Sequence, residues 1–259
     1  IEYKRNFAMS LLNKISYFQA GVVLSYFSKE IVRYVPMMAS GTSFHNDFVE
    51  SLFGALNNMV VNSDEFAISI LQLCPLFDIP INVEMYNSIT LLNFFRLEYS
   101  IFHIMQISDK NNTHWIQSFE SIQAHSGDII RIALDAYFNS SFTGKKMIVL
   151  MICCLLQIIC PEVILQIFST DLPIIETFAD IVTSVRKYDL ILRVTETLLF
   201  LCHLAQNNDQ PSIIQRIIDH FASDELIENI KSMELSEDYD EIMLNCREIE
   251  KILQSYIDS

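Results

Sequence analysis

The sequence predicts an all-α protein: a right-handed solenoid of stacked layers, each built from three helices. One observation is that turn residues are scarce, with 5 Gly and 6 Pro in 259 residues, so few tight turns are available to a β-rich fold. A second is the stretch from Asp128 to Cys160, where a helix and a short polar turn lead into an almost wholly apolar helix. A helix that is apolar on every side must be covered on nearly every side, so the chain is expected to stack layers.

The third observation is that helical patterns fill the chain. In order, we expect helices at 7–18, 22–38, 47–61, 68–77, 82–107 with one break, 115–124, 128–134, 147–160, 162–168, 172–184, 188–206, 212–222 and 239–257. Ser63, just before an apolar run, is expected to cap the helix that follows it. The segments 39–43, 108–113 and 207–211 are polar or rich in turn residues, and they are expected to be breaks.

The longest helical patterns recur at a regular interval. They begin near Asp47, Leu92, Lys145, Asp189 and Asp240. They lie roughly 45 to 50 residues apart, close to the armadillo and HEAT repeats, and the order of two short helices before a long one favours armadillo. We therefore expect one armadillo solenoid over residues 1–259, with repeats at about 1–18 (partial), 19–62, 63–108, 109–160 and 161–208 and a C-terminal cap at 209–259.

Composition narrows the function classes. The net charge of −15 argues against nucleic acid as a partner, because phosphate binding needs Lys and Arg. Two readings of the acidic surplus stay open: solubility for a chain that is 51% hydrophobic, or attraction of a basic ligand. The apolar run 147–160 is shorter than a membrane span. The six cysteines lie mostly in apolar runs, which indicates buried thiols in a reducing compartment; Cys153 and Cys160 are expected to be reduced and largely buried.

The sequence contains no catalytic or cofactor-binding signature. The six histidines are scattered, with no H-E-x-x-H, and there is no G-x-S-x-G elbow and no Gly-rich phosphate loop. We therefore expect no enzyme, no metal and no cofactor. The one tryptophan, Trp115, is expected to pack rather than bind.

Several segments resemble importin α (karyopherin α), mainly its C-terminal half. Asp128-Ile-Ile-Arg-Ile-Ala-Leu134 followed by Phe142-Thr-Gly-Lys-Lys146 is similar to a register that crosses two repeats in that family, with Lys145-Lys146 on its paired bases. Residues 48–64 resemble a family helix and place Asn58 on the family asparagine, and 188–206 and 225–256 resemble the last repeat and the final acidic helix. The chain starts at Ile1 in mid-pattern, so we expect it to be a fragment of something longer.

The resemblance implies a concave groove lined by a Trp and an Asn, four residues apart, on each third helix. The indoles hold lysine stems and the asparagine amides hold the peptide backbone. Here the corresponding pairs are Met9/Asn13, Gly54/Asn58, Phe102/Gln106, Leu150/Cys154 and Glu196/Phe200, and Glu50 is assigned to the same groove. No pair keeps both family residues. We expect an apolar, patchy groove that binds standard nuclear-localisation peptides poorly.

Two functions are therefore expected. The first is a divergent nuclear transport adaptor, cytoplasmic and nuclear, that holds an extended segment of a partner in the groove. The resemblance adds basic localisation segments, importin β and an export receptor as its partners. The alternative is an armadillo scaffold that holds one dedicated protein partner and is unrelated to import.

Overall fold

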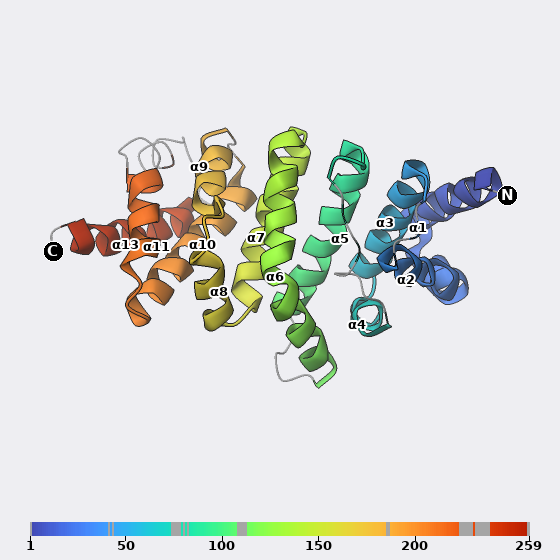
Figure 1. Ribbon diagram of the computed structural model, residues 1–259, viewed down its shortest axis with the longest axis horizontal. Helices are drawn as coiled ribbons and strands as arrows, with labels where there is room; N and C mark the ends of the chain where they lie inside the picture. Colours follow the sequence, from blue (N-terminus) through green and yellow to red (C-terminus); the bar gives the residue numbers. More distant parts are fainter. Residues whose placement is uncertain are drawn as a thin grey trace. The chain divides into compact units, whose positions relative to one another are not determined.

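The computed structural model describes residues 2–40, 42, 44–73, 79, 81, 83–107, 113–184, 187–222, 230 and 239–257. Every regular element in these ranges is a helix (Figure 1). The predicted all-α class is therefore confirmed for the described residues. The predicted segments 74–78, 108–112 and 223–229 lie outside them.

The helices have the following bounds. They are α1 (Glu2–Val32), α2 (Tyr34–Ala39), α3 (Asn46–Val61), α4 (Asp64–Leu73), α5 (Ser88–Ile107), α6 (Thr113–Asn139), α7 (Phe142–Ile158), α8 (Pro161–Phe168), α9 (Ile174–Ser184), α10 (Tyr188–Asn207), α11 (Pro211–Ile217), the π-helix η2 (Ile218–Ala222) and α13 (Asp240–Ile257). The long helices α3, α5, α7, α10 and α13 each begin within a few residues of a predicted start.

Local sequence explains where several helices begin. Ser63 accepts a hydrogen bond from the backbone N–H of Phe66 at 3.2 Å, which confirms it as the cap of α4. Asn87 caps α5 through bonds from the N–H groups of Ile89 and Thr90, at 3.0 and 2.8 Å. The helices α8 and α11 begin with proline, which has no N–H to leave unsatisfied in the first turn.

Helix α6 differs from the prediction, which placed a break between two short helices near residues 125–127. The helix runs from Thr113 to Asn139 without interruption. Buried side chains continue on one face across the expected break, at Ile122, Ser126 and Ile129. Continuous packing of that face outweighs the cost of Gly127, roughly 1 kcal/mol for a glycine inside a helix. The single helix α6 therefore replaces the two short helices that were predicted at 115–124 and 128–134.

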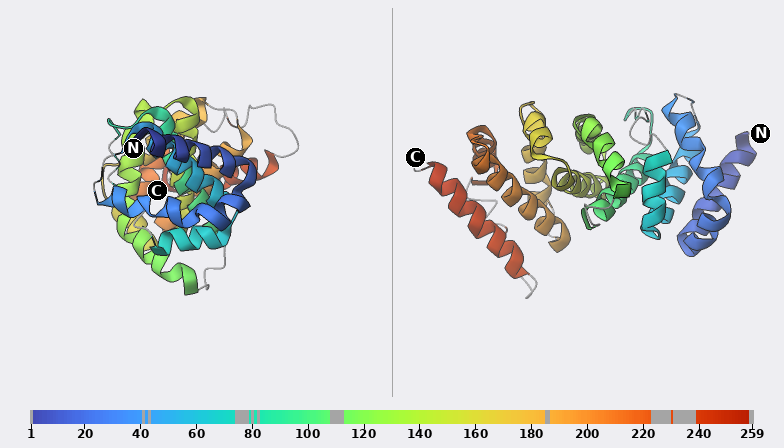
Figure 2. Two further views of the ribbon diagram at one scale, coloured as in Figure 1. Left: turned by 90° about the vertical axis from the view of Figure 1, so that its right-hand side faces the viewer. Right: turned by 90° about the horizontal axis from the view of Figure 1, so that it is seen from below.

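Helix α1, unlike α6, contains a break in helical geometry. It joins two predicted helices, and only Gln19, with φ −144° and ψ 60°, leaves helical geometry between them. The two halves run in different directions (Figure 2).

The described helices form two compact units, Ile1–Ile159 and Cys160–Ser259. In unit 1, α1, α3, α5 and α7 pack in that order, each against the next, with α4 and α6 also in contact with this row. In unit 2, α10 packs against α9, α11 and α13. The unit boundary lies within two residues of the predicted repeat start at 161.

Candidate partner-binding face

A row of polar side chains joins the long helices of unit 1. We call this row the amide seam and define it by its members: Asn13, Ser16, Asn57, Asn58, Asn93, Ser100, Gln106 and Gln157. Its bonds join residues 42 to 51 positions apart, which is about one predicted repeat. All members except the buried Ser16 are half-buried, so the seam borders the exposed surface.

Asn58 makes the connection between α1 and α3. Its Nδ2 donates to Ser16 Oγ at 2.9 Å, and to the backbone oxygen and Oδ1 of Asn13 at 3.4 and 3.3 Å. One turn earlier, a Cβ on Gly54 would lie 2.7 Å from both polar atoms of the Asn13 amide. Glycine at this position permits the close approach of the two helices.

Similar contacts connect the next helices. Between α3 and α5, Ser100 Oγ donates to Asn57 Oδ1 at 2.9 Å, and Asn93 Nδ2 donates to the backbone oxygen of Glu50 at 3.1 Å. Between α5 and α7, Gln106 Nε2 donates to Gln157 Oε1. The Cys154 thiol lies 3.7 Å from Gln106 Oε1. The row therefore reaches from α1 to α7 through neutral groups.

Three seam amides use only one end in these contacts. Within the described part of the chain, Nδ2 of Asn57 and Oδ1 of Asn58 and Asn93 make no hydrogen bond, and none of these atoms is buried. The bonded end of each amide fixes the orientation of its open end. An extended partner backbone offers N–H and C=O groups in alternation, and these open ends can satisfy both kinds.

The eleven predicted groove residues divide by exposure. The buried ones are Met9, Gly54, Phe102, Leu150 and Cys154, and the half-buried ones are Asn13, Glu50, Asn58, Gln106, Glu196 and Phe200. A partner docking on the folded chain can reach only the second group. The structure brings Asn13 to Asn58 and Gln106 to Cys154 through hydrogen bonds. The binding role of the half-buried six stays a prediction.

In unit 2, charged groups join α9 to α11 and η2, whereas a neutral bond from Asn245 Nδ2 to Thr195 Oγ1, at 3.5 Å, joins α13 to α10. Arg216 donates to the backbone oxygen of Leu172 at 2.6 Å and to both carboxylate oxygens of Glu176 at 3.3 Å. His220 Nε2 lies 3.5 Å from the same carboxylate. We call Glu176, Arg216 and His220 the ionic seam. It ties α9 to α11 and η2. Among the predicted groove residues of this unit, Glu196 is bonded to Arg193 at 3.1 Å.

Helix α1 exposes large apolar side chains. Tyr3, Phe7, Leu11 and Phe18 are 82%, 62%, 48% and 82% exposed and follow one face at helical spacing. The opposite face carries the buried Met9 and Ser16. This half of α1 therefore packs one face against the described residues and leaves an apolar face exposed on the opposite side.

Metal-binding groups and cysteines are the remaining side chains to consider in the described residues. No group of three or more His, Cys, Asp or Glu side chains there could hold a metal ion. Burial raises the pKa of the Cys202 thiol to about 12, so this cysteine is not a thiolate nucleophile. Cys153 is buried and Cys160 half-buried, and both are in the reduced, thiol form. None of the described helices is long and apolar enough to cross a bilayer.

Comparison of the chain with protein-family models, curated proteins and solved structures finds no match. Any proposal of function therefore depends on the geometry of the amide seam.

Sequence reasoning missed most of the seam. It singled out Asn13, Asn58 and Gln106 from the family pattern but passed over Asn57, Asn93 and Gln157. A usable signal was present: amides recur inside otherwise apolar helices at the predicted repeat spacing. Amides at such positions need partners when half-buried, and the nearest candidates lie one repeat away.

Proposed function

We propose that this chain is a protein-binding scaffold of the armadillo type, which holds an extended segment of a partner along the amide seam of unit 1. The observation that carries the proposal is the row of open amide ends on Asn57, Asn58 and Asn93, each oriented by a bond to the neighbouring helix. Preorganised polar groups bind with less loss of conformational entropy than mobile ones.

The armadillo arrangement is part of the proposal. It is supported by hydrogen bonds between neighbouring long helices, whose bonded residues lie 42 to 51 positions apart in the sequence. It is also supported by the order in which α1, α3, α5 and α7 pack. A stacked array needs such contacts only between neighbours, which fits the pairwise pattern of the seam.

The resemblance to importin α supports a narrower form of the proposal, a nuclear transport adaptor with basic cargo. Two features weigh against that form. The family's Trp positions are taken by residues such as Met9, Gly54 and Leu150, which are buried. Asn58, on the family asparagine, directs its amide nitrogen into the chain. A scaffold with a dedicated, less basic partner is therefore the better-supported form.

A peptide-display screen against the full chain tests the proposal. Peptides selected from a random library are expected to bind about ten-fold more weakly to the double variant Asn57→Ala/Asn93→Ala, measured by fluorescence anisotropy. Asn207→Ala, at an exposed position at the end of α10, is the matched control and should leave affinity unchanged. Equal affinity for the double variant and the wild type would place the binding surface elsewhere.

A short Lys-rich peptide separates the two forms. The scaffold form predicts that it binds much more weakly than the selected peptides. Tight binding of the Lys-rich peptide that is lost in the double variant would favour the transport adaptor instead.

A further inference from the structure

Helix α1 carries most of the exposed aromatic side chains of the described residues. Six of the eight exposed Phe and Tyr side chains in that part of the chain lie on this one helix. They are Tyr3, Phe7, Tyr17, Phe18, Tyr26 and Phe27. None of them belongs to the amide seam, whose α1 members, Asn13 and Ser16, bond to α3.

The exposed side chains form one row on each half of α1. The row before the break at Gln19 contains Tyr3, Phe7, Leu11, Lys14 and Phe18. The row after it contains Val22, Tyr26 and Lys29. Members of a row are three or four residues apart, so they share one side of the helix. We call the two rows, with the exposed Lys4 beside the first, the α1 face; both halves of α1 lie at the near end of unit 1 in the left view of Figure 2.

The α1 face is positively charged, although the chain as a whole is acidic. No Asp or Glu occurs between Tyr3 and Lys29. Lys4, Lys14 and Lys29 are exposed, and they make no ion pair within the described residues. The face therefore combines large apolar groups with uncompensated positive charge.

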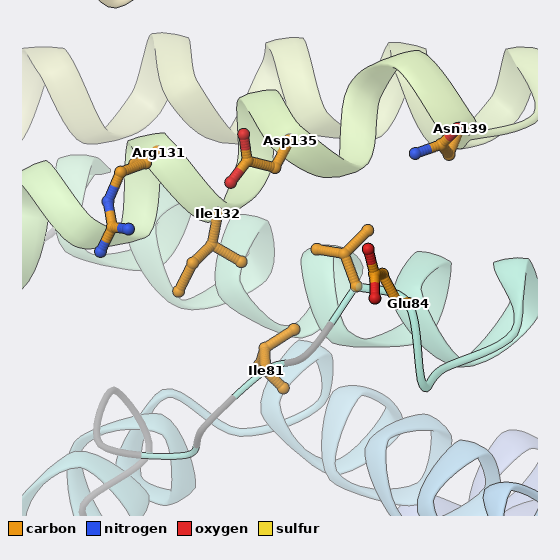
Figure 3. Close-up of a pocket in the computed structure, with 7 residues that line it drawn as sticks. Ile81, Glu84, Arg131, Ile132, Asp135 and Asn139 are labelled. Carbon is orange, nitrogen blue, oxygen red and sulfur yellow. The ribbon is translucent and has the colours of Figure 1, made fainter.

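Two arginines of other helices show the contrast. Arg131, which lines a cleft of about 570 Å³ together with Asp135 of the same helix (Figure 3), bonds Asp128 at 2.5 Å. Arg216 bonds Glu176 in the ionic seam. Carboxylates of the chain offset both of these cations, whereas the lysines of the α1 face have their charge directed to solvent.

The first row of the α1 face is large enough to bind a partner. A Phe or Tyr side chain buries roughly 150–250 Å² when it is covered, so the three mostly exposed rings of this row offer on the order of 500 Å². The largest apolar patch of a typical monomer measures roughly 300–600 Å² and is often a functional surface.

Charge and shape select the occupant of this face. A second copy docked on the same face by two-fold symmetry would bring lysines against lysines, because neither row contains a carboxylate. Nucleic acid is bound through on the order of six to ten cations, and the face supplies three. An acidic protein segment would have to follow both halves of α1, which run in different directions. A bilayer with anionic headgroups adapts to both rows and offers an apolar interior beside negative charge.

We propose that the α1 face docks this chain onto the surface of a bilayer that contains anionic lipids. The rings of Phe7 and Phe18 enter the boundary between headgroups and acyl chains, and Lys14 and Lys29 extend along the headgroups. Salt screens charges more than about 8 Å away at physiological ionic strength, so the acid-free face governs the local attraction more than the distant carboxylates do. This docking is independent of the amide seam, because it uses a different side of α1.

The test is flotation of the full chain with vesicles of phosphatidylcholine, either alone or mixed with about 30% phosphatidylserine. Partitioning to the mixed vesicles is expected to be about ten-fold stronger than to phosphatidylcholine alone, and it should weaken at about 1 M salt. The double variant Lys14→Glu/Lys29→Glu should lose the preference for phosphatidylserine. The double variant Phe7→Ser/Phe18→Ser should reduce partitioning to the mixed vesicles about ten-fold.

Matched controls separate the α1 face from general effects of substitution. Phe138→Ser removes an exposed ring of α6, Lys251→Glu reverses an exposed charge of α13, and both should leave partitioning unchanged. All the substituted side chains are exposed, so the variants are expected to fold normally, as thermal melts would verify.

Four results would overturn the proposal. Equal partitioning to both kinds of vesicle would exclude recognition of anionic lipid, and undiminished partitioning of Phe7→Ser/Phe18→Ser would exclude the α1 face. Failure to float with the mixed vesicles would exclude a bilayer as the occupant. A dimer in sedimentation velocity that Phe7→Ser/Phe18→Ser converts to monomer would assign the face to a second copy of the chain.

Discussion

The main side-chain bonds between helices differ in chemistry between the two units, although unit 2 also has a neutral bond, from Asn245 of α13 to Thr195 of α10. In unit 1 the bonds between α1, α3, α5 and α7 run through neutral amides, hydroxyls and a backbone carbonyl. In unit 2 the connection of α9 to α11 and η2 depends on Glu176, Arg216 and His220. Neutral hydrogen bonds depend little on ionic strength or pH, whereas charge pairs depend on both.

A buried carboxyl group in unit 1 complicates this comparison. Glu98 of α5 is 2% exposed, and its Oε2 has no hydrogen-bond partner within the described part of the chain. Burial raises the pKa of this carboxyl well above its ordinary 4.5. Unit 1, although its long helices are joined by neutral bonds, thus contains a buried carboxyl whose ionisation depends on pH, and replacing Glu98 should remove that contribution from the comparison.

The largest effect is therefore expected for Glu98→Leu. Replacing a buried, incompletely bonded carboxyl by an apolar side chain of similar size should raise the free energy of unfolding of unit 1 by about 2 to 3 kcal/mol at neutral pH. Hydrogen exchange of the α3 and α5 amides measures this unit separately. Faster exchange in the variant would show that Glu98 makes a stabilising contact instead.

The same residue predicts the pH dependence of unit 1. Because the folded-state pKa of Glu98 is raised above its unfolded value, its contribution to stability is fully present below about pH 4.5 and is lost as the pH rises through the folded pKa. Wild-type unit 1 should therefore become less stable from pH 4.5 upward. Glu98→Gln should remove this dependence, and an unchanged pH profile in that variant would contradict the assignment.

The second-largest effect on stability is expected when the ionic seam is broken. Arg216→Met should lower the free energy of unfolding of unit 2 by about 2 kcal/mol, because it leaves the Leu172 carbonyl and the Glu176 carboxylate without their main donor. Exchange in α9 and α11 should accelerate while exchange in α3 stays the same. Arg216→Lys, which keeps the charge but cannot reach both acceptors at once, should recover only part of the loss.

Sequence reasoning predicted the elements of both units better than the contacts between them. The starts of α3, α7 and α10 follow from apolar periodicity, which is a local property. The unbroken course of α6 was missed, because packing along its buried face outweighs the local effect of Gly127. The ionic seam was missed for a similar reason: Glu176 and Arg216 lie 40 residues apart, and only the folded chain shows that they meet.

The candidate site shows the same division. The family pattern placed Asn58 on a groove, but it could not show that the Asn58 amide nitrogen is committed to Ser16. Gly54 matched a position for a large groove residue, yet its role in the structure is close approach to Asn13. Spacing along one helix predicts which residues share a face, whereas the partner across the interface depends on the rotation of the neighbouring helix.

The third effect tests the amide seam. Asn58→Ala should lower the free energy of unfolding of unit 1 by about 1 kcal/mol, since it removes a neutral donor and leaves Ser16 Oγ and the Asn13 amide with fewer partners. Asn58→Asp should cost more, because a carboxylate would face the Asn13 oxygens. Asn207→Ala serves as the exposed control. If Asn58→Ala and Asn207→Ala behaved alike, the seam would contribute nothing to the packing of α1 on α3.

The smallest effect separates the two seams directly. Raising the ionic strength from about 0.1 to 1 M shortens the Debye length from roughly 10 to 3 Å. Arg216 and Glu176 are 24% and 37% exposed, so salt reaches the pair and should weaken it by a few tenths of a kcal/mol. Exchange in α9 and α11 should accelerate relative to α3 and α5 as salt is added, after correction for the general effect of salt on both units. Arg216→Met should abolish this difference. A difference that persists in the variant would mean that other charges of unit 2 carry its salt dependence, and that the ionic seam is held mainly by the bond from Arg216 to the Leu172 carbonyl.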